Sequence, residues 1–132
     1  VRRLSMSEVI TYKLTVKTSA GDVDVTSEGG AVTFQLQQGL AKAWACIDGT
    51  GTINLRDSFN TASVTDNGTG DYTATYSSAM NNDDYAHPLG ASVGSDFVFS
   101  RATTNIRIKP FNVGGSQVDT DPETFAILGD LA

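Results

Sequence analysis

The chain has 132 residues and a formal net charge of −6, from nine Lys and Arg against fifteen Asp and Glu. This length fits one domain, or two small modules that share a core. The acidic balance argues against nucleic acid or an anionic membrane as a partner. No window of the sequence is apolar over a length that could insert across a membrane. One cysteine excludes an intrachain disulfide and a Cys-based zinc site.

The first forty residues predict three short strands. Residues 9–17 (VITYKLTVK) alternate between apolar and polar residues, which is typical of a half-buried strand. A short return strand around Val25 and a third strand at residues 31–36 (AVTFQL) follow, each after a turn. The sequence therefore predicts a three-stranded meander over residues 8–37, with a short joint at residues 37–39.

The next strand, residues 41–47 (AKAWACI), carries a row of small side chains. Ala41, Ala43 and Ala45 share one face of it. Small side chains allow another surface to approach closely, either a facing sheet of the same chain or a neighbouring subunit. We therefore mark these three alanines as a candidate oligomer interface.

Residues 52–59 (TINLRDSF) predict a strand that bends. Ile53, Leu55 and Phe59 share a face by alternation, but Asp57 falls on that face too. An unpaired carboxylate is costly to bury, so we expect a bulge or bend at residues 56–58. The turn sequences DGTG (48–51) and DNGTG (66–70) predict hairpin turns on either side.

The remaining chain continues the strand pattern. We expect Tyr72, Ala74 and Tyr76 of DYTATY to point inward, residues 77–84 to form an exposed loop, and TFAIL near the C-terminus to form the last strand. Two strands in between, DFVFSR and TNIRIK, are expected to turn inward Phe97, Phe99, Ile106 and Ile108. No amphipathic helix of about ten residues is evident. The predicted fold is all-β, an antiparallel sandwich or meander of about nine to eleven short strands.

The stretch from residue 41 to residue 76 resembles a module that recurs near the C-terminus of tail fibres and similar virion appendages of tailed bacteriophages, marine ones especially. The resemblance rests on AKAW, GTGT, RDSFN and TDNGTGDYT in this order, with a looser echo at residues 79–85. It implies a virion structural protein, a short fibre, spike or knob on tail or head. It also implies a homotrimer, contacts with other virion structural proteins, contact with a host-surface glycan, and no enzymatic activity, since the module has no known catalytic signature.

The resemblance begins only at Ala41. We therefore expect residues 1–39 to form an N-terminal module that attaches to the particle or to an adjoining chain. Residues 40–132 would form the fibre-like β-domain. The alternative function is a carbohydrate-binding β-sandwich module, for which Trp44, Tyr76 and Tyr85 are candidate aromatic platforms. For Trp44 a core or interface position is favoured, because it lies mid-strand between alanines.

The residues suited to catalysis or metal binding are few. His87 is the only histidine, and no nucleophile-elbow motif accompanies it; Cys46 is expected to be a packed residue. Three acidic turns could in principle supply Ca²⁺ ligands, but none has a full calcium-loop pattern, and Asp and Asn are common in turns for backbone reasons. These turns are residues 66–71, 81–84 and 119–123. We predict no catalytic residue, no metal and no cofactor.

A host-surface contact is predicted in the loop at residues 81–87. Its candidate residues are Asn81, Asn82, Asp83, Asp84, Tyr85 and His87. Tyr85 would be the apolar platform, and Asn82 and Asp83 would form hydrogen bonds. The competing interpretation is that Tyr85 begins the next strand and points into the core.

Overall fold

The computed structural model describes residues 24–26, 33–92 and 94–132. Its contacts divide the chain into Val1–Gln37 and Gln38–Ala132. In the first unit, β1 (Asp24–Thr26) pairs antiparallel with β2 (Thr33–Gln35). These strands match the predicted second and third strands, except that Leu36 begins the short helix α1 (Leu36–Gly39). The strand predicted at residues 9–17 lies outside the described residues.

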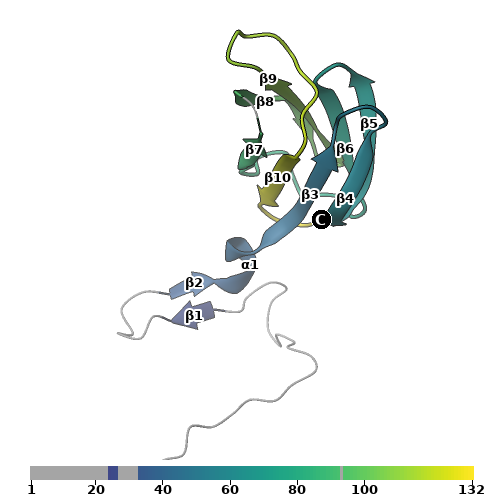
Figure 1. The fold of residues 1–132 in the computed structure, drawn as a ribbon. Coiled ribbons are helices and arrows are strands. Elements are labelled where there is room, and N and C mark those ends of the chain that lie inside the picture. Colours follow the sequence, from purple (N-terminus) through teal and green to yellow (C-terminus); the bar gives the residue numbers. More distant parts are fainter. Residues whose placement is uncertain (1–23, 27–32, 93) are drawn as a thin grey trace, which may run out of the picture. The chain divides into compact units, whose positions relative to one another are not determined.

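The second unit is a sandwich of two four-stranded antiparallel sheets (Figure 1), which confirms the predicted fold class. The first sheet has the order β4-β3-β10-β7, and the second has the order β5-β6-β9-β8. The strands of the first sheet are β3 (Ala41–Asp48), β4 (Asn54–Phe59), β7 (Leu89–Ala91) and β10 (Glu123–Leu128). Those of the second are β5 (Thr61–Gly68), β6 (Asp71–Tyr76), β8 (Ser95–Ala102) and β9 (Asn105–Phe111). No helix among the described residues is long and apolar enough to cross a membrane.

The core lies between the two sheets and follows the period-two alternation of their strands. The first sheet turns Ala43, Ala45, Ile47, Phe125 and Ile127 into it. The second sheet contributes Tyr72, Ala74, Tyr76, Ile106 and Ile108. The inward residues predicted for β6 and β9 are therefore confirmed.

The alanine row of β3 packs within the chain itself. Ala43 and Ala45 are buried in the core of the sandwich, and Ala41 is half-buried. Of the two explanations for small side chains here, the facing sheet is the one that the structure shows. The predicted oligomer interface is therefore wrong for Ala43 and Ala45, because their surface is already covered by the chain's own second sheet.

A bulge in β4 confirms the bend that Asp57 predicted. Ile47 of β3 lies opposite Leu55, but the next residue, Cys46, lies opposite Asp57, so Arg56 is the extra residue. The bulge turns Asp57 to solvent and keeps Leu55 against the core. It also reverses the alternation beyond it, so Phe59 lies 52% exposed on the outer face, and its predicted inward position is wrong.

Candidate binding face

The outer face of the second sheet carries two large apolar side chains that alternation had placed in the core. Phe97 and Phe99 of β8 are 64% and 60% exposed, so their predicted inward positions are wrong. The strand turns Val98 inward instead, opposite the buried Ile108. Three consecutive apolar residues fit either face of a strand, and the register with β9 decides which face is buried.

Phe99 is the unmatched residue of a bulge in β8. Val98 pairs with Ile108 and Ser100 pairs with Arg107, which leaves Phe99 without an opposite residue. Two cations of β9 lie over its ring, with the Arg107 guanidinium carbon 4.9 Å and the Lys109 Nζ 4.3 Å from the centroid. These are cation–π distances, so each cation is attracted by the ring while the ring stays largely exposed.

Asp71 of β6 holds both cations in place. Its carboxylate accepts hydrogen bonds from Arg107 Nε (2.6 Å) and Nη2 (2.7 Å), and its Oδ2 lies 3.0 Å from Lys109 Nζ. The bidentate bonds from Arg107, helped by Lys109, lower the pKa of Asp71 to about 2 against the opposing effect of burial. The carboxylate raises the pKa of Arg107 in turn. One negative charge therefore orders two positive charges on this face.

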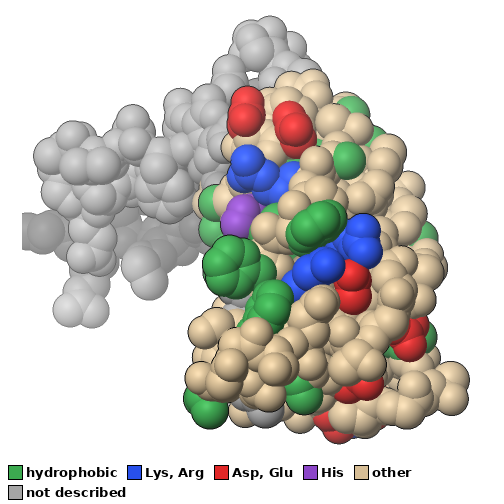
Figure 2. Space-filling view, turned by 90° about the horizontal axis from the view of Figure 1, so that it is seen from above, with side chains coloured by type: hydrophobic (Ala, Val, Ile, Leu, Met, Phe, Trp, Pro, Cys, Tyr) green, Lys and Arg blue, Asp and Glu red, His purple; other side chains and the backbone are tan. Residues whose placement is uncertain are grey.

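The aromatic surface continues across β9. Phe97 packs edge-to-face on Phe111, with ring centroids 5.9 Å apart at 77°. A shallow hollow of about 490 Å³ lies beside this pair, lined by the two rings and by Gly94, Ser95, Asn112, Val113 and Gly115. We call Phe97, Phe99, Arg107, Lys109 and Phe111 the aromatic–basic face. Figure 2 shows hydrophobic and basic side chains next to one another and to the histidine on one side of the molecule.

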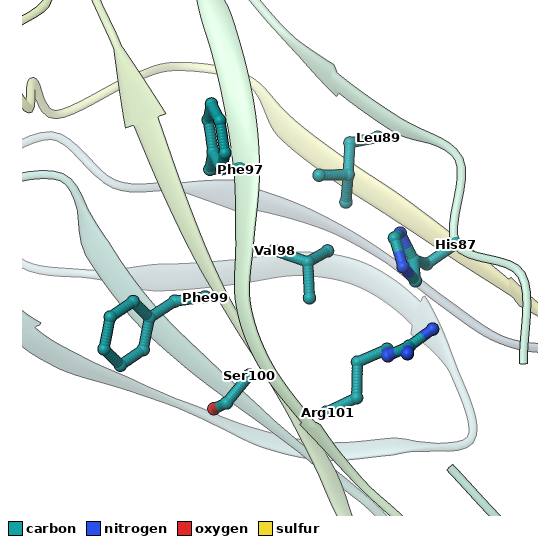
Figure 3. A pocket seen from close by; sticks show the side chains of 7 residues that line it. All are labelled: His87, Leu89, Phe97, Val98, Phe99, Ser100 and Arg101. Carbon is teal, nitrogen blue, oxygen red and sulfur yellow. The ribbon is translucent and has the colours of Figure 1, made fainter. Parts of the chain in front are cut away.

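A larger hollow of about 680 Å³, which we call the edge groove, lies where the two sheets end side by side. It is lined by His87 and Leu89 next to β7 and by the consecutive residues 97–101 of β8 (Figure 3). Strands β7 and β8 are edge strands of their sheets. The side chains of Val98, Leu89, His87 and Arg101 converge in Figure 3, whereas Phe99 and Ser100 point away from them.

Tyr85 is not an exposed platform. Its side chain is buried at 3% exposure, so the predicted role in surface contact is wrong and the competing inward position is confirmed. Its hydroxyl accepts a hydrogen bond from the Tyr76 hydroxyl and lies 3.1 Å from the carbonyl oxygens of Ala102 and Asn105. Tyr76 is buried as well, which removes both tyrosines as carbohydrate platforms.

The rest of the predicted contact loop is divided. Asn81, Asn82, Asp83 and Asp84 are exposed, and the Asn82 side chain accepts the backbone N–H of Asp84. Met80, placed by prediction in the same exposed loop, is buried instead. His87 is half-buried and lines the edge groove. The structure thus brings His87 to the groove, and the four preceding polar residues are not among those that line it.

The acidic turns are held by hydrogen bonds and ion pairs within the chain. Asp119 Oδ1 accepts from Gly70 N (2.7 Å) and from the Tyr72 hydroxyl (3.0 Å). Asp121 pairs with Arg56, and the buried Glu123 accepts from Thr120. Among the described residues, no group of three or more His, Cys, Asp or Glu is placed to hold a metal ion.

The surroundings of His87 fit a packing or binding role better than a catalytic one. Its ring lies edge-to-face on Tyr85 at 6.5 Å, and the hydroxyl of Ser100, which shares the groove, points away from it in Figure 3.

Comparison of the chain with protein-family models, with curated proteins and with solved structures gives no match. The likeness to phage fibres therefore depends on the sequence motifs alone.

Sequence reasoning missed the aromatic–basic face. A signal for it was present, because Arg107, Lys109 and Phe111 alternate with the apolar Ile106, Ile108 and Pro110 and must share the outer face of β9. What could not be read was the position of β8 beside them, which brings Phe97 and Phe99 to the same face.

Proposed function

We propose that this protein is a structural component of a tailed-bacteriophage particle, a short fibre, spike or knob on tail or head. In this proposal the sandwich is a recognition and assembly module. The aromatic–basic face is the observation that carries it: the two sheets bury a core of their own between them, yet large aromatic rings stay on the surface beside ordered cations. Contiguous exposed apolar surface of this kind is characteristic of interaction sites.

The residues that carry the phage resemblance are mostly scaffold residues. AKAW supplies core positions of β3, RDSFN contains the bulge of β4, and the two glycine-rich runs form turns. The aromatic–basic face lies on β8 and β9, outside that stretch. This arrangement suits a common scaffold that presents a separate contact surface, which supports the proposal.

The N-terminal module, residues 1–39, would attach the sandwich to the particle or to a neighbouring chain. The homotrimer implied by the resemblance would have to use surfaces other than Ala43 and Ala45, which are buried within the chain. Sedimentation of the full chain measures the mass of the assembly directly. A stable monomer at micromolar concentration would remove the trimer from the proposal.

A second candidate, a carbohydrate-binding module, is favoured by one specific feature. Trp44 is half-buried on the outer face of the first sheet, directly opposite the exposed Phe59. Beside it lies a hollow of about 350 Å³ that includes Pro88, Leu89 and Thr124. An aromatic ring beside a shallow, mainly apolar hollow can stack on the apolar face of a sugar.

The two candidates differ in where the protein is found and in which ring matters. Antibodies against the full chain should label purified particles, and a chain without residues 1–36 should fail to enter particles while its circular dichroism stays that of a β-protein. Absence from purified particles would contradict the virion proposal. Glycan binding that is lost in Trp44→Ala but kept in Phe97→Ala would favour the carbohydrate-binding module.

A further inference from the structure

The edge groove runs along the free edge of β8. Successive side chains of a strand point to opposite faces, so a hollow on one face contacts only every second residue. The edge groove is lined by five consecutive residues, 97–101. It therefore lies beside the main chain of the strand, at its edge.

That edge has no partner strand among the described residues. β8 is the last strand of the second sheet and pairs on one side only, with β9. An unpaired edge presents a row of backbone N–H and C=O groups that an extended peptide can bind by adding a strand. The bulge at Phe99 adds twist, which prevents long flat pairing and limits the occupant to a short segment. Five residues of strand span about 17 Å.

Charge decides what kind of segment fits. Residues 38–132 contain five Lys and Arg against eleven Asp and Glu, yet three of those five cations stand on β8 and β9. Arg107 and Lys109 share Asp71, and Arg101 lies at the groove beside His87. Three of these five cations thus stand on the last two strands of the sheet, two of them paired with the single carboxylate of Asp71, and the remaining positive charge complements an acidic ligand.

We propose that the free edge of β8 binds a short, extended, acidic peptide segment of a partner protein as an added strand. Its backbone would pair beside residues 97–101, and its apolar side chains would enter the edge groove against Val98 and Leu89. Its carboxylates would face Arg101 on one side and Arg107 with Lys109 on the other. A saccharide fits less well, because the Ser100 hydroxyl, the only side-chain hydroxyl among the residues that line the groove, points away from its centre.

A fluorescence-anisotropy titration of the full chain with a labelled peptide tests this directly. The probe is an eight-residue peptide of two Val-Val-Glu-Glu repeats, which places both Val and Glu on each face of an added strand. Two control peptides carry Lys in place of Glu, or N-methyl groups on alternate residues that remove main-chain donors. We expect the Glu peptide to bind at least about tenfold more tightly than either control, the equivalent of one charge-assisted or main-chain interaction lost.

Two pairs of matched variants locate the site. Arg101→Gln should weaken binding about fivefold to tenfold, whereas Arg56→Gln on the other sheet removes the same charge and should not. Phe97→Ala should weaken binding, whereas Phe59→Ala, another exposed ring, should not. All four side chains are exposed, and circular dichroism checks that each variant folds.

Several results would overturn the proposal. The first is that the N-methylated peptide binds as tightly as the unmodified Glu peptide. The second is that the two variants of a pair lose the same affinity. The third is that no binding is seen up to about 1 mM peptide, which corresponds to very weak affinity. Binding of an acidic polysaccharide such as polygalacturonate, without binding of the peptide, would assign the edge to a glycan instead. The assay uses purified protein without particles, so its failure would leave the virion proposal standing.

Discussion

Replacing Tyr85 by alanine tests whether the 81–87 loop is anchored in the core. The ring is 3% exposed and lies edge-to-face on Tyr76, with centroids 6.2 Å apart. Truncating a buried aromatic side chain costs about 3–5 kcal/mol of unfolding free energy. We expect Tyr85→Ala to fall in that range, because the loss combines the cavity with the hydrogen bonds of the hydroxyl.

Tyr85→Phe separates these two contributions. It keeps the ring but removes the group that accepts from Tyr76 and lies within 3.1 Å of the Ala102 and Asn105 carbonyl oxygens. Leaving buried polar groups without partners costs about 1–3 kcal/mol. Phe59→Ala is the matched control, because it removes an aromatic ring that is already 52% exposed and should cost well under about 2 kcal/mol.

Urea denaturation, followed by circular dichroism and by the fluorescence of the single tryptophan, measures all three variants. For a domain of this size, each kcal/mol shifts the melting temperature by about 4–8 °C, so Tyr85→Ala should melt at least about 12 °C below the wild type. A shift of only a few degrees, no larger than that of Phe59→Ala, would show that the ring is not a core residue. The loop would then be available for surface contact.

Two further predictions concern Asp71 and the turn before it. Because the folded pKa of Asp71 is about 2, below its usual 3.8, its contribution to stability is full above about pH 5 and is lost as the pH falls toward 2. The loss of unfolding free energy should be about 1–2 kcal/mol, allowing for the partial exposure of Arg107. It should be missing from the acid titration of Asp71→Asn. A variant whose stability falls with pH as the wild type's does would argue against the ion pair. Gly70→Ala should cost more than about 2 kcal/mol in chemical denaturation, since φ is +59° and a Cβ would approach the Val118 backbone nitrogen to 2.5 Å. Gly51→Ala has a similar φ of +65° with open space around it and should cost only about 1 kcal/mol, so equal losses would mean that the contact with Val118 is unimportant.

Local rules predicted the parts of the fold that depend on neighbouring residues. The glycine-containing turns, the inward row of β6 and the bulge at Arg56 were all readable from the sequence. The bulge shows why. A carboxylate on the apolar side of a strand is costly to bury, and one extra residue in the strand turns it to solvent with little change to the rest of the sheet. Ten strands lie in the described residues.

The features that failed depend on contacts between distant segments. In the sequence, Val98 is as good a candidate for an inward position as Phe97 and Phe99. Only the pairing of β8 with β9 decides which of them point into the core. Tyr85 sits in a polar stretch with no periodicity. Its burial depends on Tyr76, nine residues earlier, and on the carbonyl groups of Ala102 and Asn105 at the facing ends of β8 and β9. The alanine row was ambiguous for the same reason, since small side chains do not say which surface covers them.

The ordered cations of the aromatic–basic face lead to a last prediction about Asp71. Removing its charge by Asp71→Asn makes the face more positive, which alone should favour an acidic ligand. The gain is small, because a charge several ångströms from an exposed ligand is worth at most about 1 kcal/mol in water. The opposing effect is the loss of order in Arg107 and Lys109, which Asp71 holds at 2.6–3.0 Å. Each long side chain that is freed costs about 0.5–1.5 kcal/mol of binding free energy to immobilise again.

The ordering effect should therefore outweigh the charge effect. We expect Asp71→Asn to bind the Glu-containing peptide less tightly than the wild type. High salt screens the charge effect and leaves the ordering effect, so the difference should widen as salt is raised. Tighter binding by Asp71→Asn at low salt, disappearing at high salt, would show that this face acts through its net charge alone. In that case the fixed positions of its cations would not matter for recognition.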